Sequence, residues 1–596
     1  VVLVGCPWAG QIHVFRIQGD RAEPQAIIKL PHVRGMSFDQ EGRLFIASGS
    51  QLQRYDRPQP LDGELGPSKI LASDLEEPHE LTFDVKGRVY VSQAGQSHQV
   101  RVFSAEGQQF RTIGRPGGPQ FGLYDEQRMH NPAGIAVDAE GKLWVCEADY
   151  APKRISVWDV TTGRFLKAFY GPPRYGGGGH LDPQDRTRFY YPSNNQGIEY
   201  VLDYENQTSK PRAIYWLKGH SSGRAPGTVV YWGGYRYLVN PFIGPSYFLS
   251  GRLDVFRYDP AGGKAQIIAS LGDMGRKSMG KLDIMNEAVE NDPQVKAGIT
   301  NADGSFVVWS DLNVDGAVQA DELQVGQFGG GVMFDRDLSV CTEAGWAMAP
   351  PRITKEGIPV WNLLAAKRFT ADTPNWLGNA LEIDKDRYVM SPGWGGWGGG
   401  PMTAWRDGRR LWMYHTHLGS LAMAPQFTGQ LILPKRYIGF CFQPMDAQVG
   451  PMFAVNAYRG SIYVFTADGL YVTDLGGNVR AKPLLRLPEA RPGMLVDDFS
   501  FNDEHFWPAI QQMNNGSIYL AAGKEFTGIF GVEGLESTHP IDPFTLTVSR
   551  EMLQHRPKIW LQRPRPKESE RILTIKIADA PPRIDGQLDE WEQAAW

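Results

Sequence analysis

The chain has 596 residues, with 68 glycines, 42 prolines, an aromatic share of 11% and a formal net charge of −5. It contains no long basic run, so its charge gives no support to nucleic-acid binding. It also lacks any run of about 18 apolar residues that would predict a membrane-spanning helix. We therefore expect no nucleic-acid partner and no membrane span.

A hairpin pattern recurs along the first third of the chain. Residues 131–146 form a strand, a tight turn at Asp138–Gly141 and a second strand, with apolar residues at alternating positions. Gly35–Ile46 and Glu80–Val91 have the same form, and weaker copies follow at 299–308, 380–390 and 510–520. A unit of strands that repeats about every 40 residues cannot bury its apolar face by itself and must pack on its neighbours. We therefore predict an all-β fold, a β-propeller of about eight blades, with seven as the alternative.

The three clear units, over residues 32–172, resemble the NHL-repeat class of propeller. The resemblance rests on a proline, the segment Gly134–Asp138, a glycine turn and the strand Leu143–Val145. It implies a propeller and no particular activity, because propellers serve many functions. We expect the strand Gln11–Ile17 to complete the last blade. We also expect the long glycine- and proline-rich loops to be ordered on one propeller face.

The C-terminal part has a different composition. We place the propeller at 1–545, a charged, proline-rich linker at 546–571 and the start of a new domain at 572–596. The segment Ala580–Trp591 resembles the opening of β-sandwich domains related to carbohydrate-binding module family nine and the DOMON group. A whole sandwich needs many more strands. We therefore expect this domain to be incomplete and further C-terminal domains to exist in the full-length protein.

The beginning of the chain and its cysteines bear on its location. The sequence starts with Val1 and has neither a methionine nor a charged segment there, which is typical of a processed or trimmed start. We expect a secreted protein, extracellular or periplasmic. The cysteines are far apart and form no CxxC pair, so we expect buried thiols rather than metal ligands, with one or two disulfides as the alternative. They are Cys6, Cys146, Cys341 and Cys441.

Residues 311–322 match the twelve-residue calcium loop. Side-chain oxygens occupy positions 1, 3, 5 and 12, and Gly316 at position 6 permits the sharp turn. We expect a structural Ca²⁺ here, and the alternative is a solvated acidic turn. The predicted ligands are Asp311, Asn313, Asp315, the carbonyl of Ala317, and Glu322.

Several histidines and loop residues are candidates for chemistry. His415 and His417 would share one face of a strand and suit either a second metal or an acid/base pair. His130 and His505 precede hairpins and would lie near the channel mouth, or be ordinary loop residues. The loop tryptophans and tyrosine suit stacking on sugar rings. The predicted catalytic residues are His415, His417, Tyr414, His180, Asp182, Asp185 and Arg186, and the predicted substrate-binding residues are Trp394, Trp397, Tyr175, His130 and His505.

Three functions stay open. The first is a secreted carbohydrate-active enzyme that cleaves a polysaccharide or oligosaccharide, as a lyase with a His or Tyr base, or as a glycoside hydrolase with two carboxylates such as Asp182 and Asp185. The second is a non-catalytic scaffold that binds a glycan or a protein. The third is a metal-dependent lyase or oxidoreductase that uses His415 and His417.

Overall fold

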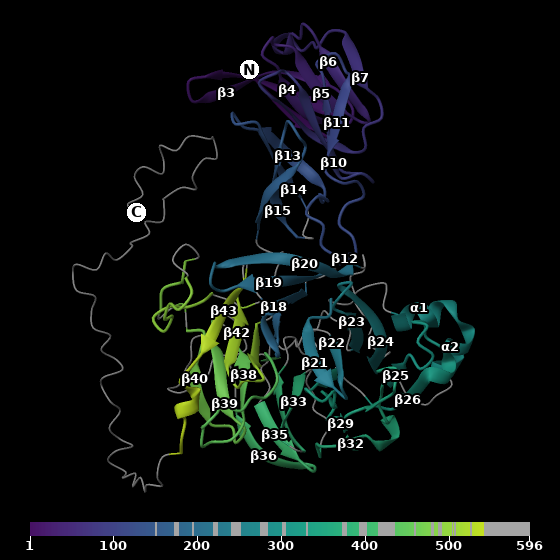
Figure 1. Cartoon of the computed structure of the whole chain (residues 1–596), viewed down its shortest axis with the longest axis vertical. Coiled ribbons are helices and arrows are strands. Elements are labelled where there is room, and N and C mark those ends of the chain that lie inside the picture. The colour runs from purple at the N-terminus through teal and green to yellow at the C-terminus, as the bar shows by residue number, and fades with distance from the viewer. Residues whose placement is uncertain are drawn as a thin grey trace, which may run out of the picture. The chain divides into compact units, whose positions relative to one another are not determined.

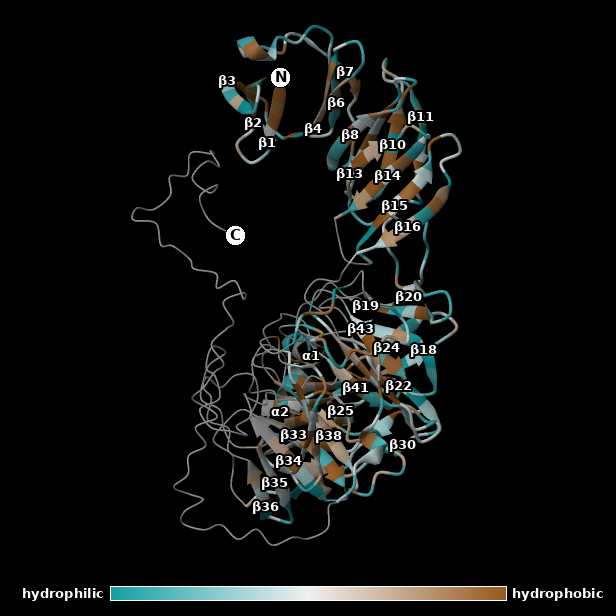
Figure 2. Ribbon diagram, turned by 90° about the vertical axis from the view of Figure 1, so that its left-hand side faces the viewer, coloured by the Kyte–Doolittle hydropathy of each residue, from teal (hydrophilic) through white to brown (hydrophobic). Residues whose placement is uncertain are grey.

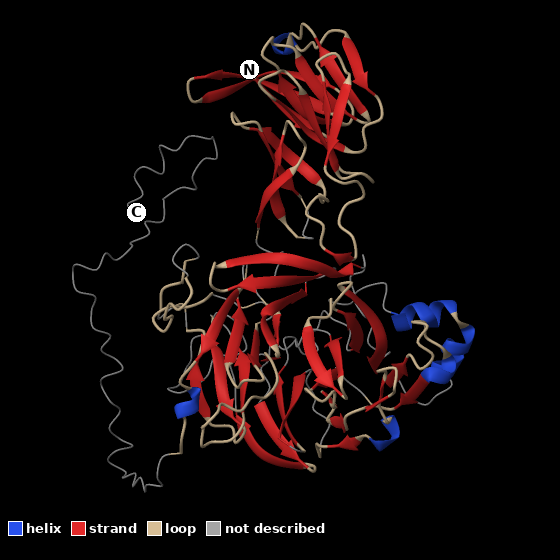
Figure 3. Cartoon of the chain, viewed as in Figure 1, coloured by secondary structure: helices blue, strands red, loops and turns tan. Residues whose placement is uncertain are grey.

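The computed structural model describes residues 1–540, with internal gaps. The segments outside it are 149–151, 172–177, 193–195, 218–224, 240–251, 274–283, 301–305, 329–331, 372–377, 385, 393–401, 415–435, 458–459, 478, 480–481, 487–490, 503–504, 506–507, 525–526 and 541–596. Residues 1–539 form one compact unit. The described chain is mostly β-strand, and its α-helices are α1 (Ile284–Asn291) and α2 (Pro293–Thr300) (Figures 1 and 3). None of these helices is long and apolar enough to cross a membrane.

Four antiparallel sheets of consecutive strands come first. Each is built from strands that are neighbours in the sequence, as hairpins require. The strands are β1 (Val2–Cys6), β2 (Gln11–Gln18) and β3 (Arg21–Lys29); β4 (Val33–Phe38), β5 (Leu44–Ser48), β6 (Gln51–Tyr55) and β7 (Ser68–Ala72); β8 (Pro78–Phe83), β9 (Val89–Gln93), β10 (Gln99–Phe103) and β11 (Gln109–Ile113); and β13 (Pro132–Val137), β14 (Lys142–Glu147), β15 (Arg154–Asp159) and β16 (Phe165–Tyr170).

The three predicted hairpins are confirmed. In each, an aspartate follows the first strand and accepts hydrogen bonds from the backbone across the turn, as Asp39 does from the Arg43 amide at 2.8 Å. In two of the hairpins the aspartate also binds a side chain of the second strand: Asp84 accepts from the Tyr90 hydroxyl at 3.0 Å, and Asp138 accepts from Trp144 Nε1 at 2.8 Å. The glycine of each turn has a positive φ, such as 77° at Gly141, which a residue with a side chain adopts only with strain.

Six sheets make up the rest of the described chain. The short strand β12 (Gly122–Leu123) joins the first of them at its edge. Their strands are β17 (His180–Asp182), β18 (Asp185–Pro192), β19 (Gln196–Asp203) and β20 (Thr208–Leu217); β21 (Thr228–Trp232), β22 (Tyr235–Val239), β23 (Arg252–Asp259), β24 (Lys264–Asp273), β25 (Phe306–Ser310) and β26 (Leu323–Gly326); β27 (Val332–Phe334), β28 (Val340–Thr342), β29 (Trp346–Met348) and β32 (Lys367–Arg368); β33 (Gly378–Asp384), β34 (Arg387–Pro392), β35 (Met402–Arg406) and β36 (Arg409–Tyr414); β37 (Arg436–Tyr437), β38 (Met452–Asn456), β39 (Ile462–Thr466) and β40 (Tyr471–Asp474); and β41 (Ala509–Gln512), β42 (Ile518–Ala522) and β43 (Gly528–Val532). A two-stranded ribbon, β30 (Arg352–Ile353) with β31 (Pro359–Val360), lies between β29 and β32 in the sequence.

These six sheets close into a circle, as in a propeller. Each sheet packs on the next, and the last packs on the first, where Leu181 and Phe189 meet Met513 and Ala521. Gln511 ties the two ends together: its Oε1 accepts the Leu181 amide at 2.5 Å and its Nε2 donates to the Leu181 carbonyl at 3.0 Å. Because a propeller sheet packs between two neighbours, both sides of the β17–β20 sheet are used within this circle.

The all-β propeller fold is therefore as expected, but three details differ from the sequence prediction. The circle starts at His180, and the four earlier sheets are not members of it, so the described strands do not form one ring of seven or eight blades. Gln11–Ile17 does not complete the last blade, since β2 pairs with β1 and β3. Residues 299 and 300 belong to a helix, where the pattern at 299–308 predicted a strand, because Pro293 begins α2, which runs to Thr300.

Alternation of buried and exposed residues builds the cores between sheets. Val100 and Val102 of β10 and Leu143 and Val145 of β14 are at most 1% exposed and pack in one cluster. Figure 2 shows hydrophobic residues concentrated on strands such as β10 and β14. Helices α1 and α2 cover β25, where Trp309 is fully buried.

We expect Gln511→Ala to weaken the closure of the circle. The change removes both hydrogen bonds to Leu181, and unpaired buried backbone groups cost about 1–3 kcal/mol. Urea denaturation should show this loss in the free energy of unfolding. Gln108→Ala, at an exposed position, is the matched control and should stay within about 0.5 kcal/mol of the native chain. Equal stabilities of the two variants would contradict this role of Gln511.

Candidate functional site

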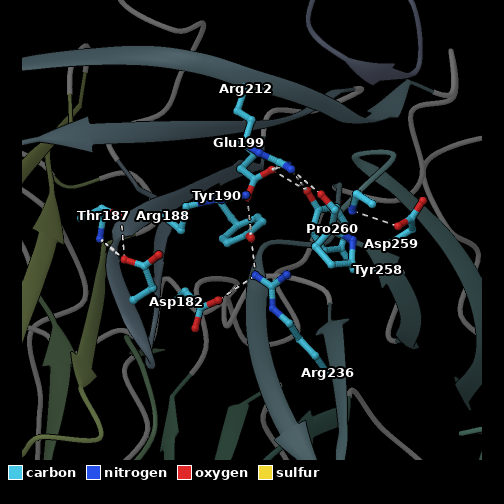
Figure 4. Close-up of polar contacts among 12 residues, drawn as sticks. Asp182, Thr187, Arg188, Tyr190, Glu199, Arg212, Arg236, Tyr258, Asp259 and Pro260 are labelled. Atoms are coloured by element: carbon cyan, nitrogen blue, oxygen red, sulfur yellow. Dashed lines mark hydrogen bonds and ion pairs between the residues drawn. The ribbon is translucent and has the colours of Figure 1, made fainter.

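A buried polar network joins the first two sheets of the circle (Figure 4). Its centre is Glu199 on β19, whose side chain is fully buried. Glu199 Oε1 accepts hydrogen bonds from Arg188 Nε and from the Tyr190 hydroxyl, both at 2.8 Å. Its Oε2 accepts from Arg212 Nη1 at 2.7 Å and from the Tyr258 hydroxyl at 2.5 Å. Both carboxylate oxygens are thus fully used.

The network continues to the inner strands of the two sheets. Arg236 on β22 donates to the Tyr190 hydroxyl and to Asp182 Oδ2, the latter at 2.7 Å. The Tyr231 hydroxyl donates to the same carboxylate at 3.0 Å. The Arg236 guanidinium also lies over the rings of Tyr190 and Tyr258, 5.2 and 4.9 Å from their centroids. One chain of polar contacts therefore runs from Asp182 to Glu199 across both sheets.

The surroundings of each ionisable group in this network determine whether that group is charged at neutral pH. Burial by itself raises the pKa of Glu199, but the bonds from Tyr258, Arg188 and Tyr190 outweigh it and hold the pKa below its ordinary value. Burial and the charge of Asp182 raise the pKa of Tyr231 to about 12. A general acid or base works best with a pKa near the working pH. The network is therefore suited to holding the first two sheets of the circle together and not to transferring protons at neutral pH.

His180, a predicted catalytic residue, is the first residue of β17 and is 3% exposed. Its Nε2 lies 3.4 Å from Thr228 Oγ1, and its Nδ1 has no hydrogen-bond partner among the described residues. Burial lowers the pKa of His180 to about 3. The imidazole is therefore neutral at pH 7, and in this setting it is no source of a proton.

The structure does not bring the other predicted catalytic residues of this region into one cluster. Asp182 is held by Tyr231 and Arg236. Asp185 accepts hydrogen bonds within its own exposed turn. Arg186 donates to the Tyr519 hydroxyl at 2.8 Å and thus contacts the last sheet of the circle. Asp182 and Arg186 therefore have structural partners.

The two predicted channel histidines belong to different groups of sheets. His130 precedes β13, outside the six-sheet circle, and its ring makes an edge contact with His98 at 5.7 Å. His505 precedes β41 within the circle, is 2% exposed and lies 3.0 Å from the Gly460 carbonyl through Nε2. The structure therefore gives them no shared site.

The remaining predicted site residues lie outside the described residues. They are His415, His417, Trp394, Trp397 and Tyr175, together with the side chain of Tyr414, which is the last residue of β36. The strands that flank them are described. In a sheet of four consecutive antiparallel strands, the start of the first strand, the end of the second and the end of the fourth lie at the same edge. In the β17–β20 sheet this edge begins with His180, and in the β33–β36 sheet the corresponding edge holds the ends of β34 and β36.

Two partly buried carboxyl groups were not singled out from the sequence. Burial raises the pKa of Asp335 to about 6, and burial with the charges of Asp335 and Asp337 raises the pKa of Glu382 to about 7. Ser339 Oγ donates to Glu382 Oε2 at 3.3 Å. Carboxyl groups that titrate near neutrality are candidates for acid/base chemistry. No sequence motif joins them, because they meet only through the packing of β33 on β27 and β28.

The predicted calcium loop forms a compact turn between β25 and β26. Asp311 is fully buried and accepts the amides of Asp315 at 3.1 Å and Gly316 at 3.2 Å. Gly316 has a φ of 74°, as its position in the motif requires. Glu322 accepts the Leu312 amide at 2.7 Å. The loop thus folds with two of its carboxylates turned toward its own backbone.

The loop has an excess of negative charge. Among the described residues, no lysine or arginine forms an ion pair with Asp311, Asp315 or Glu322. Burial and the neighbouring charges of Glu322 and Asp315 raise the pKa of Asp311, and backbone hydrogen bonds only partly oppose this. Among the described side chains, no group of three or more His, Cys, Asp or Glu is arranged to hold a metal ion.

All four cysteines are free thiols. Cys341 is buried, Cys6 and Cys441 are partly buried, and burial raises the pKa of Cys441 to about 12. Cys146 is exposed, which differs from the expectation of a buried thiol. It alternates with Leu143 and Val145 in β14, and its side chain falls on the outer face.

Comparison with known proteins gives no family. No family model matches the chain, and no curated protein does. Among solved structures, the chain is similar to a protein of unknown function from Desulfotomaculum acetoxidans, with 14% identity and a TM-score of 0.21 over 45% of this chain and 78% of that one. It is also similar to a gluconolactonase from Xanthomonas campestris, with 14% identity and a TM-score of 0.19 over 39% and 74% of the two chains. These values are too low to indicate what this chain binds.

We expect Glu199→Gln to destabilise the chain by about 3 kcal/mol, because Arg188 and Arg212 lose the carboxylate between them. A lowered pKa gives stability that is present above the ordinary carboxyl pKa and is lost as the pH falls through the folded-state value. The difference between native and variant chains should therefore be full at neutral pH and shrink in acid.

The control for this change is Glu106→Gln, at an exposed turn. Thermal melts from pH 7 down to strongly acidic pH should show little effect of the control. A Glu199→Gln penalty that stays constant across this range would show that the charge of Glu199 does not stabilise the fold.

Proposed function

We propose that this chain is a carbohydrate-active propeller protein that binds a polysaccharide or an oligosaccharide and cleaves it, as a lyase or a glycoside hydrolase. The observation that carries the proposal is the position of two strand ends in the fourth sheet of the circle. Strands β34 and β36 end at the same edge of that sheet, immediately before the sequence segments with Trp394, Trp397, His415 and His417. Propellers commonly place functional loops on one face.

The residue types in these two sequence segments suit saccharide chemistry. Tryptophans between glycines would offer flat apolar surfaces to sugar rings, and histidine can take a proton at neutral pH. Burial lowers the pKa of His180 to about 3, so its imidazole is too weak a base, and the base in this proposal is His415, His417 or Tyr414. A lyase would remove the proton beside a uronate carboxylate, while a hydrolase would need a carboxyl pair.

Replacement of His415 or His417 by alanine should abolish turnover of the true substrate and leave the melting temperature nearly unchanged. General acid/base groups contribute about 10²–10⁴-fold to rate, so the loss should be at least of this order. The assay is a screen of polysaccharides for soluble products, by mass and by the absorbance of an unsaturated uronate. His539→Ala, at an exposed position near the end of the compact unit, is the matched control.

The outcomes separate the functions. Unsaturated products identify a lyase, and saturated products identify a hydrolase. If the native chain binds a glycan but forms no product, the proposed enzyme is rejected and the chain is a non-catalytic glycan-binding propeller. Full activity of both histidine variants would show that neither His415 nor His417 is a catalytic residue.

We also propose that residues 311–322 hold a structural Ca²⁺ in a secreted protein. The ligands would be those predicted from the sequence: Asp311, Asn313, Asp315, the carbonyl of Ala317 and Glu322. The support is the turn at Gly316 and the absence of an ion-pair partner for the three carboxylates among the described residues. The bound ion would offset the repulsion between these carboxylates.

Chelation should lower the melting temperature, and calcium should restore it. A ligand at 100 times its dissociation constant stabilises by about 2.7 kcal/mol. Asp315→Asn should weaken the response to calcium, whereas Asp20→Asn, at an exposed turn, should not. Identical melting curves in excess EGTA and in about 10 mM CaCl₂, well above the affinity of weak extracellular sites, would reject the calcium site.

A further inference from the structure

A groove of about 980 Å³ lies beside β12. The segment around β12 forms one wall, the turn into β16 forms a second, and the start of β20 forms a third. Its volume is at the upper end of the range of about 300–1,000 Å³ for small-molecule sites. The groove is therefore large enough for an extended ligand.

The β12 wall is held from two sides. On one side, β12 pairs with Ala213 and Ile214 of β20, and the Tyr124 amide donates to the Arg212 carbonyl at 2.9 Å. On the other side, the fully buried Arg154 guanidinium holds the segment. It donates to the Tyr124 hydroxyl at 2.6 Å and to the carbonyls of residues 126 and 128 at 3.1 and 2.6 Å. The wall is thus in place before any ligand binds, which lowers the entropic cost of binding.

The groove carries more positive than negative charge. Its lining includes four cationic side chains, Arg115, Arg128, Arg164 and Lys210, against the carboxylates of Asp125 and Glu126. Asp125 is paired with Arg115 and, at 3.5 Å, with Arg128. The Arg164 side chain forms no hydrogen bond or ion pair with a described residue, and Lys210 forms no ion pair with one. These two exposed cations come from separate walls and are available to an anion.

The other lining groups are of the kind that bind hydroxyl-rich molecules. The amides of Gln120 and Gln127 and the hydroxyl of Thr162 offer both donors and acceptors. The rings of Tyr124 and Phe165 line the same groove. A ligand that fits this set has sugar rings, many hydroxyls and a few negative charges.

We propose that this groove is an accessory binding site for an acidic oligosaccharide, one that carries carboxylate or sulfate groups. Arg164 and Lys210 would pair with its anionic groups, and the amides and rings would contact its hydroxyls and ring faces. The choice of a saccharide over another anion rests on the function proposed above, but the site does not depend on cleavage. A nucleic acid fits less well, because the chain has a net charge of −5 and the groove has no continuous basic track.

Isothermal titration of the native chain tests the site with three saccharides of equal length at low salt. Hexagalacturonate supplies carboxylates, sulfated maltohexaose supplies sulfates, and maltohexaose is the neutral comparison. We expect at least one acidic saccharide to bind at least about tenfold more tightly than maltohexaose, and added salt to weaken its binding. The double variant Arg164→Gln/Lys210→Gln should lose about tenfold in affinity for that saccharide.

The matched control is Arg16→Gln/Lys29→Gln, which removes the same charge from exposed positions on β2 and β3. It should keep the native affinity. The proposal is overturned if neither acidic saccharide binds, if maltohexaose binds as tightly, if the groove variant binds like the control, or if a thymidine oligonucleotide of equal charge binds more tightly. Groove binding without cleavage of any polysaccharide would reject the proposed enzyme alone. Cleavage that persists without groove binding would reject the groove alone.

Discussion

Closure of the six-sheet circle is the constraint on which the rest of the structure depends. A sheet in a propeller has two apolar faces, and both are covered only when the last sheet meets the first. Among the strands that the structure describes, none is shared between the two ends, since β41–β43 and β17–β20 are separate sheets. The joint is made by side-chain packing of Leu181 and Phe189 with Met513 and by the two bonds of Gln511. The closure is therefore non-covalent and formed by packing between sheets.

The first sheet of the circle carries additional reinforcement. The polar network around Glu199 joins it to the second sheet. At its outer edge, β12 pairs with β20 and satisfies backbone groups that an edge strand would leave open. Arg154, from β15, binds the residues that follow β12. Buried charges cost desolvation energy, and Glu199 and Arg154 are retained here with several charged or polar partners each.

Local features of the sequence predicted local structure well. The hairpins at Asp39, Asp84 and Asp138 follow from an aspartate, a glycine and alternating apolar residues, all within a few positions of one another. The membership of the circle did not follow, because alternation says which face of a strand is buried and not which sheet covers it. The Glu199 network and the Asp335–Glu382 pair were missed for the same reason: their members come from different strands at no fixed spacing. The candidates at His415 and His417 stay predictions, since they lie outside the described residues.

The separation between Leu181 and Gln511 has a consequence for synthesis. The hydrogen bonds that join them span 330 positions. A ribosome adds about 5–20 residues per second, so roughly 15 to 70 s pass between the two ends. During this time one apolar face of the β17–β20 sheet has no final partner, while the sheets before residue 170 complete their hairpins from contacts near in the sequence. The period before closure is thus when a nascent chain of this protein is most exposed to aggregation and has most need of a chaperone.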